Sequence, residues 1–232
     1  MGGVMLVFGD GAVRGGRCPR GQADRSAHAV AGAWSDADQA GERTFMQIIL
    51  VRHGRPDHRN PRWCTPREMK AWIARYNAAR VVVGEAPPAV RALASKAGWV
   101  VCSSLSRCMQ SRSQLVQGPQ HAGDALFAEA HLPYLDWDFP RLPARFWRLV
   151  FRGAWFLGFS RHTESVRVSD RRARVAAEQL IALAETHGQV LLMGHGIMNI
   201  LIGRHLRRLG WSGPLHLFLR PYWSPSVYEK GA

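Results

Sequence analysis

Short apolar runs that alternate with amphipathic segments constrain the fold of this chain most strongly. QIILV (residues 47–51), GWVVCSS (98–104) and QVLLM (189–193) have the length and composition of buried strands. Helical patterns come between them, and the turns are short. Strands that alternate with helices in this way are typical of a mostly parallel sheet with helices on both faces. The sequence therefore predicts an α/β fold, a three-layer sandwich in which helices flank the sheet.

Helices are predicted where apolar residues recur at helical spacing. The clearest covers about residues 66–79, where Thr65 and Glu68 form a capping box and Pro66 fits the first helical position. Further helices are expected over 105–117, 169–188 and 197–210. Segment 124–133 (DALFAEAHLP) is predicted to hold a short strand and a loop. Edge strands are predicted at 215–219 (LHLFL) and 226–230 (SVYEK).

Residues 1–45 differ in composition from the rest of the chain. They are rich in Gly, Ala, Asp and Arg and show no helical or strand periodicity. Such a segment cannot bury enough apolar surface to offset the entropy of ordering it. We expect a disordered extension, with the folded domain spanning 46–232, and we consider Met46 as an alternative initiator.

The charge balance indicates an anionic partner. Lys and Arg number 31 against 17 Asp and Glu, which leaves a net charge of +14, nearly all of it from arginine. The planar guanidinium suits phosphate and other oxyanions, although charge alone fits a nucleic acid or a membrane surface equally well. No apolar stretch is long enough to predict a membrane span.

The cysteines give no sign of a disulfide framework or a zinc site. Cys18, Cys64, Cys102 and Cys108 form neither a CxxC pair nor a zinc-ligand spacing, and no secretory leader precedes them. We interpret them as free thiols in a reducing cytoplasm.

Three polar segments follow directly after predicted strands. They are Arg52-His53-Gly54, the segment Ser103–Arg107, and Gly194-His195-Gly196. In an open α/β sheet, ligands bind beyond the carboxyl ends of the strands. We therefore expect these three segments to meet at one edge of the sheet.

The residue types in these segments suit phosphoryl transfer. A neutral histidine such as His53 can attack phosphorus, and the transferred group needs fixed cationic donors around it. Arg52, Arg107 and His195 can supply those donors, and Gly54 would leave room for the phosphoryl group. Glu129 is the best candidate for the acid that protonates the leaving oxygen. Weaker candidates for this acid are Asp57 and Asp136.

These segments together resemble the histidine phosphatase superfamily, the phosphoglycerate-mutase-like proteins. Arg52-His53-Gly54 and Gly194-His195-Gly196 are similar to its two histidine motifs, and SSLSRCMQS (103–111) is similar to its motif of serines followed by an arginine, here Arg107. The resemblance covers about residues 46–200 and continues weakly through YWSPSVYEK. It implies a phosphoglycerate-mutase-like fold, a nucleophile at His53, a phosphate pocket of Arg52, Arg107 and His195, a proton donor at Glu129, and no metal or other cofactor.

The sequence departs from the family pattern after Gly54. Mutases and many phosphatases of the family carry Ser or Thr two residues after this glycine and Asn soon after, whereas this chain has Pro56 there. This weakens a mutase interpretation and favours a phosphatase. Asn60 is a candidate substitute for the missing Asn, and His58 is a candidate for the pocket mouth.

A basic, aromatic stretch covers residues 141–161 (RLPARFWRLVFRGAWFLGFSR). Its arginines recur at helical spacing beside large apolar residues. We favour a helical cap over the site, within an insertion at about 136–165, because insertions at this place in the superfamily often form one. A helix lying on an anionic surface and a plain buried helix remain alternatives.

The sequence therefore predicts a cytoplasmic, metal-independent phosphatase that hydrolyses a small phosphomonoester through a phosphohistidine at His53. One alternative is a non-catalytic protein on the same fold that binds a phosphorylated ligand or an anionic surface. A weaker alternative is a phosphotransferase of the phosphoglycerate mutase type. We expect no nucleic-acid partner, whereas a peripheral contact with an anionic membrane and the oligomeric state stay open.

Overall fold

The structure is a computed structural model that describes residues 45–116 and 123–231. The predicted disordered extension therefore lies outside the described residues, apart from Phe45, which opens the first strand. The elements follow in the order β1 (Phe45–Arg52), α1 (Glu68–Ala78), α2 (Pro88–Lys96), β2 (Trp99–Cys102), α3 (Ser106–Ser113), the 3₁₀ helix η1 (Ala125–Phe127), α4 (Ala144–Phe156), α5 (Val166–His187), β3 (Gln189–Gly194), α6 (Gly196–Arg208) and β4 (Pro225–Gly231).

The four strands form one open, mixed sheet in the order β2-β3-β1-β4. β1 and β2 each pair with β3 in parallel, and β4 pairs with β1 in the antiparallel direction at one edge. The register aligns Arg52 with Gly194 and Cys102 with Met193. The three parallel strands therefore end at the same level, and the residues that follow them start side by side.

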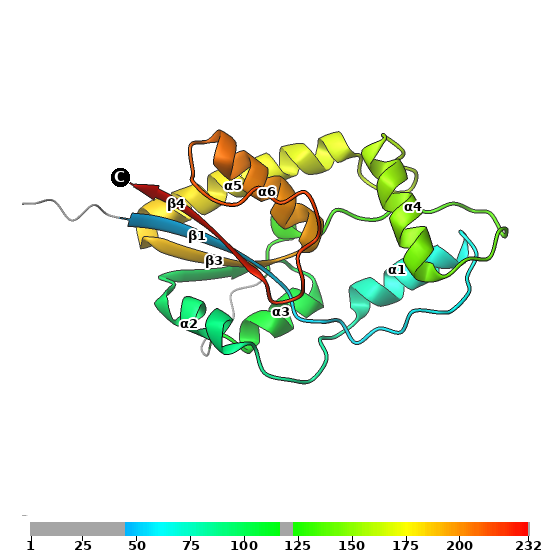
Figure 1. The fold of residues 1–232 in the computed structure, drawn as a ribbon, viewed down its shortest axis with the longest axis horizontal. Helices are drawn as coiled ribbons and strands as arrows, with labels where there is room; N and C mark the ends of the chain where they lie inside the picture. Colours follow the sequence, from blue (N-terminus) through cyan, green and yellow to red (C-terminus); the bar gives the residue numbers. More distant parts are fainter. Residues whose placement is uncertain (1–44, 117–122, 232) are drawn as a thin grey trace, which may run out of the picture. The chain divides into compact units, whose positions relative to one another are not determined.

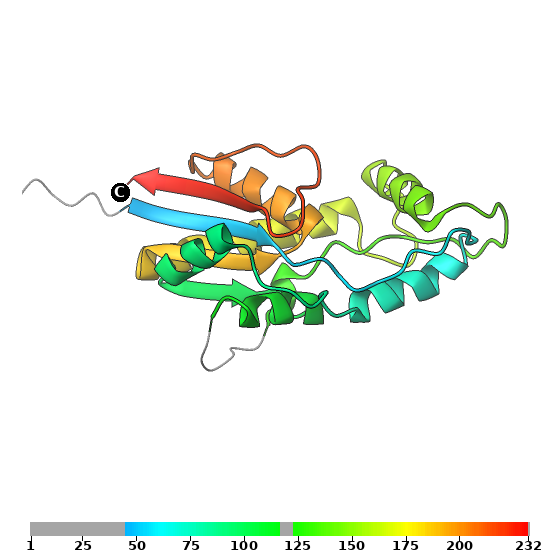
Figure 2. The ribbon, with the colours of Figure 1, turned by 60° about the horizontal axis from the view of Figure 1, so that its bottom comes forward.

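Helices cover both faces of the sheet, as Figures 1 and 2 show. Successive residues of β1 alternate between two cores. Ile48 and Leu50 belong to the core that includes residues of α5 and α6, whereas Ile49 and Val51 belong to the core that includes residues of α2 and α3. The predicted α/β three-layer sandwich is confirmed, with β4 as an antiparallel exception to the mostly parallel sheet.

A third apolar cluster joins α4 to α1, beyond the carboxyl ends of the parallel strands (Figure 1). Trp147 and Phe151 of α4 pack there with Met69 and Trp72 of α1. Trp155, one further turn along α4, reaches the core beneath α5 and α6. Helix α4, which lies within the predicted 136–165 insertion, is thus held in place by the buried residues along one side of it.

Two predicted strands are wrong. Segment 124–133 contains the 3₁₀ helix η1 instead of a strand, because the Asp124 side chain accepts a hydrogen bond from the Leu126 N–H and turns the chain. Segment 215–219 is irregular, and its leucines and phenylalanine are exposed instead of paired.

The remaining element predictions differ mainly at their boundaries. The capping box is present, with hydrogen bonds in both directions between Thr65 and Glu68, although α1 proper begins only at Glu68. α2 was not predicted from the sequence. In the part of the chain that the structure describes, no helix is long and apolar enough to cross a membrane.

Candidate active site

The ends of the parallel strands bring the three predicted segments together. The His53 N–H donates to the Gly194 carbonyl at 3.0 Å, and the Ser103 N–H donates to the Met193 carbonyl at 3.1 Å. The imidazole rings of His53 and His195 lie edge to face with their centroids 5.0 Å apart. The parallel register thus brings His53 and His195, which are more than 140 residues apart in the sequence, into one site.

The His53 side chain is buried, with 1 % of its surface exposed. Its Nδ1 lies 2.7 Å from the Gly54 carbonyl, which can only accept, so Nδ1 carries the proton and Nε2 holds a lone pair. The Arg107 Nε–H donates to that Nε2 at 3.2 Å. Burial, with the positive charges of Arg107 and Arg52, lowers the pKa of His53 to about 3 although the Gly54 hydrogen bond opposes the shift. The imidazole is therefore neutral at physiological pH, as a nucleophile must be.

Arg107 extends from the first turn of α3 and is completely buried. Its Nη1 donates to the backbone carbonyls of Tyr76 and Asn77 and to the Asn77 side-chain oxygen at 3.4–3.5 Å. Its guanidinium lies 4.9 Å from the centre of the Tyr76 ring. No carboxylate is among these contacts, so an anion in the cavity would meet a cation that has only neutral partners.

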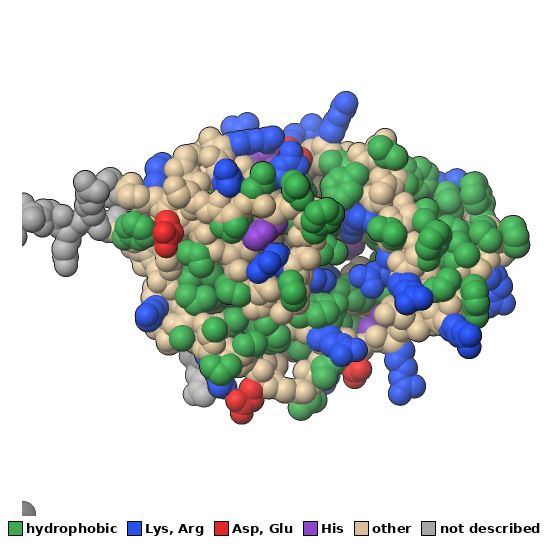
Figure 3. All heavy atoms as spheres, in the orientation of Figure 1, with side chains coloured by type: hydrophobic (Ala, Val, Ile, Leu, Met, Phe, Trp, Pro, Cys, Tyr) green, Lys and Arg blue, Asp and Glu red, His purple; other side chains and the backbone are tan. Residues whose placement is uncertain are grey.

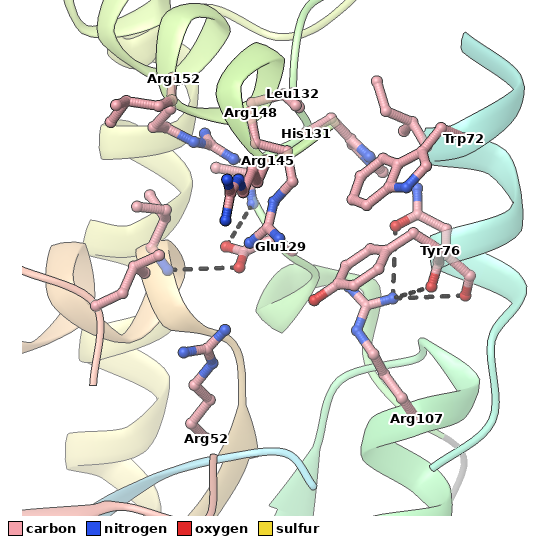
Figure 4. Close-up of a pocket in the computed structure, with 16 residues that line it drawn as sticks. Arg52, Trp72, Tyr76, Arg107, Glu129, His131, Leu132, Arg145, Arg148 and Arg152 are labelled. Atoms are coloured by element: carbon pink, nitrogen blue, oxygen red, sulfur yellow. Dashed lines mark hydrogen bonds between the residues drawn. The ribbon is translucent and has the colours of Figure 1, made fainter. Parts of the chain in front are cut away.

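Arg52, at the end of β1, points into the cavity from below in Figure 4. Its guanidinium carbon lies 4.2 Å from the centre of the Tyr222 ring, and its Nη1 donates to the Arg220 carbonyl. Its Nε is buried without a hydrogen-bond partner. A buried cationic N–H without an acceptor is costly, and an anion in the cavity is a natural acceptor for it.

Gly54 is placed differently from the sequence expectation that it leaves room for a phosphoryl group. A Cβ at this position would meet Val81 Cγ1 at 2.6 Å and the Trp223 ring at 2.8 Å, so protein atoms already fill the space. The Gly54 N–H donates to Ser111 Oγ at 2.8 Å. Glycine is required here for close packing between the loop after β1, Val81 and Trp223.

His195 is completely buried between the end of β3 and the start of α6. Its Nε2 lies 2.8 Å from Ser103 Oγ, and its Nδ1 lies 3.4 Å from Arg107 Nη2. Burial, followed by the charge of Arg107, lowers the pKa of His195 well below its ordinary value. Because Nδ1 faces a guanidinium that can only donate, the favoured tautomer carries its proton on Nε2 and accepts at Nδ1.

Glu129 follows η1 and lies at the N-terminus of α6. Its Oε1 accepts the Met198 N–H at 3.1 Å, and its Oε2 accepts the Ile197 N–H at 3.4 Å. Free N–H groups in the first turn of a helix favour a carboxylate at this position. Glu129 also lines the cavity, with its carboxylate between the arginines in Figure 4.

Of the sequence candidates, Arg52, Arg107 and Glu129 line the cavity, whereas the buried His53, Gly54 and His195 lie behind its lining residues. The remaining candidates do not line it either. Asp57 and Asn60 are exposed on the loop after β1, and Asp136 is ion-paired with Arg161 and His162. His58 packs against the rings of Trp72 and Tyr76, at centroid distances of 5.0 and 5.7 Å. Of the carboxylates proposed as proton donors, Glu129 alone lines the cavity.

The cavity between the strand ends and α4 has a volume of about 380 Å³. Arginines enter it from two sides, with Arg52 and Arg107 below and three arginines of α4 above (Figure 4). The lining residues are Arg52, Trp72, Ile73, Tyr76, Asn77, Arg107, Glu129, Ala130, His131, Leu132, Arg145, Arg148, Leu149, Arg152, Ile197 and Leu219. This volume exceeds what a phosphoryl group alone requires and leaves space for the rest of a substrate.

The cap helix α4 presents Arg145, Arg148 and Arg152 to the cavity because they are three and four residues apart on one side of the helix. The Arg152 Nη2 donates to the Ala130 carbonyl at 2.9 Å, while its Nη1 is buried without a partner. Burial, followed by the charge of Arg148, lowers the pKa of Arg152, and Glu129 opposes this shift. The cap thus adds positive charge to a cavity that is already cationic.

Several cavity residues escaped the sequence analysis. Trp72, Tyr76 and Asn77 come from α1. Tyr222, from the segment before β4, does not line the cavity, but its ring lies tilted against that of His53, with the centroids 5.6 Å apart. Burial and a hydrogen bond with Tyr222 are among the causes that raise the pKa of Tyr76 to about 12. The segment YWSPSVYEK was the available signal for Tyr222, whereas nothing local marks the α1 residues.

Comparison with known proteins supports the fold of this chain but not an activity or a substrate. No protein-family model matches the sequence, and no curated protein matches it. Solved structures do match. A mycobacterial glucosyl-3-phosphoglycerate phosphatase is 18% identical with a TM-score of 0.51, covering 80% of this chain and 90% of its own. A second match, "Mycobacterial hydrolase 2", is 20% identical with a TM-score of 0.56, covering 81% of this chain and 83% of its own. A third, "Mycobacterial hydrolase 1", is 19% identical with a TM-score of 0.54, covering 78% of this chain and 88% of its own.

The arrangement of strands and helices agrees with that of these structural neighbours. At such low identity the likeness establishes architecture and leaves activity and substrate to the geometry of the site. The described part of the chain has a phosphoglycerate-mutase-like α/β fold, as these solved structures do.

Proposed function

We propose that this protein is a phosphatase that hydrolyses a phosphomonoester through a phosphohistidine intermediate on His53. The observation that carries the proposal is the state of His53. Its Nδ1 is held by the Gly54 carbonyl, its Nε2 faces Arg107, and its lowered pKa keeps the ring neutral. A neutral imidazole oriented in this way, with arginines on two sides, is equipped to attack a phosphoryl group.

Substrate binding places the phosphoryl group between Arg52 and Arg107. The Arg107 Nε–H, which in this structure donates to His53 Nε2, turns to a phosphate oxygen and frees the lone pair. The Arg52 Nε–H, which has no partner in this structure, donates to an oxygen of the same group. Arg107 thus exchanges a neutral hydrogen-bond partner for a charged one, which makes the bond stronger, and Arg52 gains a charged partner where it had none.

The first chemical step forms a bond from His53 Nε2 to phosphorus and breaks the bond from phosphorus to the leaving oxygen. Glu129, protonated in the complex, gives its proton to that oxygen. Water then attacks the phosphohistidine, Glu129 takes up the proton that water loses, and phosphate leaves with His53 restored. His195, neutral and tied to Ser103, stays beside Arg107 and helps to position its guanidinium.

The substrate class follows from the charge of the cap. Arg145, Arg148 and Arg152 lie across the cavity from Arg52 and favour a small phosphorylated molecule with a second anionic group (Figure 4). Replacing all three arginines with glutamine should lower the preference for substrates that carry two anionic groups over simple phosphomonoesters. Unchanged selectivity across a panel of phosphomonoesters would contradict this assignment.

Trapping with a ³²P-labelled phosphomonoester tests the proposed mechanism. We expect a phosphoenzyme that is labile in acid and stable in base, and that disappears in His53→Ala. His187→Ala, which changes a histidine at the end of α5 that stacks on Trp99, is the matched control and should keep the label. A label that survives in His53→Ala would contradict His53 as the nucleophile.

A second candidate is a non-catalytic protein that binds a phosphorylated ligand with the same residues. The position of Glu129 favours it, because both oxygens of its carboxylate already accept backbone N–H groups at the start of α6. Tight binding of inorganic phosphate without any phosphoenzyme, over a broad substrate panel, would support this candidate. Transfer of the phosphoryl group to a second substrate instead of water would point to the mutase alternative.

A further inference from the structure

The outward face of the cap helix is apolar and has no partner within the described chain. α4 has three faces: a buried stripe, an arginine stripe toward the cavity, and a stripe formed by Phe146, Leu149, Val150, Phe156 and Leu157. Leu149 and Val150 lie three and four residues after Phe146, and Phe156 and Leu157 lie seven residues after Leu149 and Val150, so all five share one side of the helix. All are exposed, Leu149 by 71% and Leu157 by 90%.

A second exposed apolar segment lies on the opposite side of the cavity mouth. Leu215, Leu217, Phe218 and Leu219 follow α6, and Leu217 and Phe218 are exposed by 75% and 83%. Leu219 lines the cavity together with Leu149 of α4, so both apolar surfaces reach its rim. Figure 3 shows hydrophobic side chains over α4 and over the segment before β4, with Lys and Arg side chains around the hollow between them.

The two stretches of chain that carry these apolar segments have charge of one sign. No acidic residue occurs between Asp138 and Glu164 or between Glu185 and Glu229, although these two stretches contain nine arginines. Arg204, Arg207 and Arg208 line a shallow groove together with Leu215, directly beside the second apolar segment. Exposed apolar side chains bordered by arginines suit a partner with anionic groups over an apolar interior.

We propose that these two apolar segments and their arginines form one docking surface for an anionic lipid bilayer. Leucine and phenylalanine side chains enter the interface between headgroups and acyl chains, while the arginines contact lipid phosphates. Because Leu149 and Leu219 belong to both the docking surface and the cavity rim, docking places the mouth of the cavity at the bilayer. This inference concerns the surface of the protein and does not depend on the reaction proposed for the site.

Cosedimentation of the full chain with lipid vesicles tests the docking surface. We expect binding to vesicles of phosphatidylcholine mixed with phosphatidylglycerol, little binding to phosphatidylcholine alone, and weaker binding as salt is added. The double variants Phe146→Gln/Leu157→Gln and Leu217→Gln/Phe218→Gln change exposed residues that do not line the cavity. Each should weaken binding to the anionic vesicles by at least about ten-fold.

The matched control is Val83→Gln/Val175→Gln, which replaces exposed apolar residues outside the docking surface and should bind like the wild type. Binding that is equal for both kinds of vesicle, or unchanged in both patch variants, would overturn the proposal. So would self-association of the lipid-free protein that the patch variants abolish, because a second copy would then cover this surface. Vesicle binding and hydrolysis of p-nitrophenyl phosphate are measured separately for the wild type and for His53→Ala. Loss of vesicle binding by the wild type counts against docking alone, whereas absence of hydrolysis counts against the phosphatase proposal alone.

Discussion

Replacing His53 with asparagine should change how the stability of this protein depends on pH. The folded protein holds the imidazole neutral, with a pKa of about 3 in place of the ordinary 6.5, chiefly because of burial and then because of Arg107. The unfolded chain takes up a proton as the pH falls through 6.5, whereas the folded protein does not. Protonation therefore favours the unfolded state, and stability is lost as the pH falls below 6.5.

The size of the effect follows from these two pKa values. Between pH 7 and pH 5, proton uptake by the unfolded chain at one such histidine lowers the free energy of unfolding by about 2 kcal/mol. The folded state begins to recover this loss only near pH 3. Since domains of this kind are stable by about 5–15 kcal/mol, an effect of about 2 kcal/mol is measurable.

Urea unfolding followed by tryptophan fluorescence, at a series of pH values from 8 to 5, measures this effect. His53→Asn removes the titrating group, so its free energy of unfolding should fall by about 2 kcal/mol less than that of the wild type over the interval from pH 7 to pH 5. His131→Asn, at an exposed position on the cavity wall, is the matched control. The same pH dependence in His53→Asn and the wild type would refute the argument that His53 is held neutral by burial.

Three further substitutions test individual contacts of the site. Gly54→Ala brings a Cβ to within 2.8 Å of the Trp223 ring, so thermal unfolding should show a loss of about 1–3 kcal/mol, and an unchanged midpoint would contradict the packing argument. Arg107→Lys keeps the charge but loses the planar fork, so inorganic phosphate should compete about 10- to 100-fold less well as an inhibitor, and wild-type inhibition would remove Arg107 from the phosphate site. Glu129→Gln keeps an oxygen for the Met198 N–H but has no proton to give. It should lower kcat by about 100-fold or more for alkyl phosphates and far less for p-nitrophenyl phosphate, whereas an equal loss for both would indicate a positioning role.

Local sequence patterns were sufficient to place the principal site segments. Arg52 and His53, Arg107, and His195 each follow a recognisable strand, and strand ends in a parallel sheet converge wherever the chain goes between them. Hydrophobic patterning also located α4, because its three faces repeat with the helical period. These features depend on periodicity along the chain and on a general property of parallel sheets.

The mistaken predictions share a physical cause. LHLFL has the composition of a strand, but composition does not supply a neighbouring edge, and this segment instead stays exposed between α6 and β4. Segment 124–133 pairs only through Ser103 and Asp124 before Asp124 turns it into a 3₁₀ helix. Beyond this one bridge, neither segment has a neighbouring strand to pair with in the described part of the chain, so the local preference for a strand was not sufficient.

The sequence by itself determined the α/β class, the buried strands, and the identity of the arginines and histidines at their ends. These features could be predicted because the spacing of apolar residues along the chain distinguishes strands from helices. Only the tertiary structure decided that Gly54 serves packing, that Glu129 binds the N-terminus of α6, and that residues of α1 and Tyr222 enclose the site. It also decided the protonation states, since burial and nearby arginines lower the pKa values of His53 and His195. Such effects depend on distances between residues far apart in the chain, and no pattern of neighbouring residues encodes those distances.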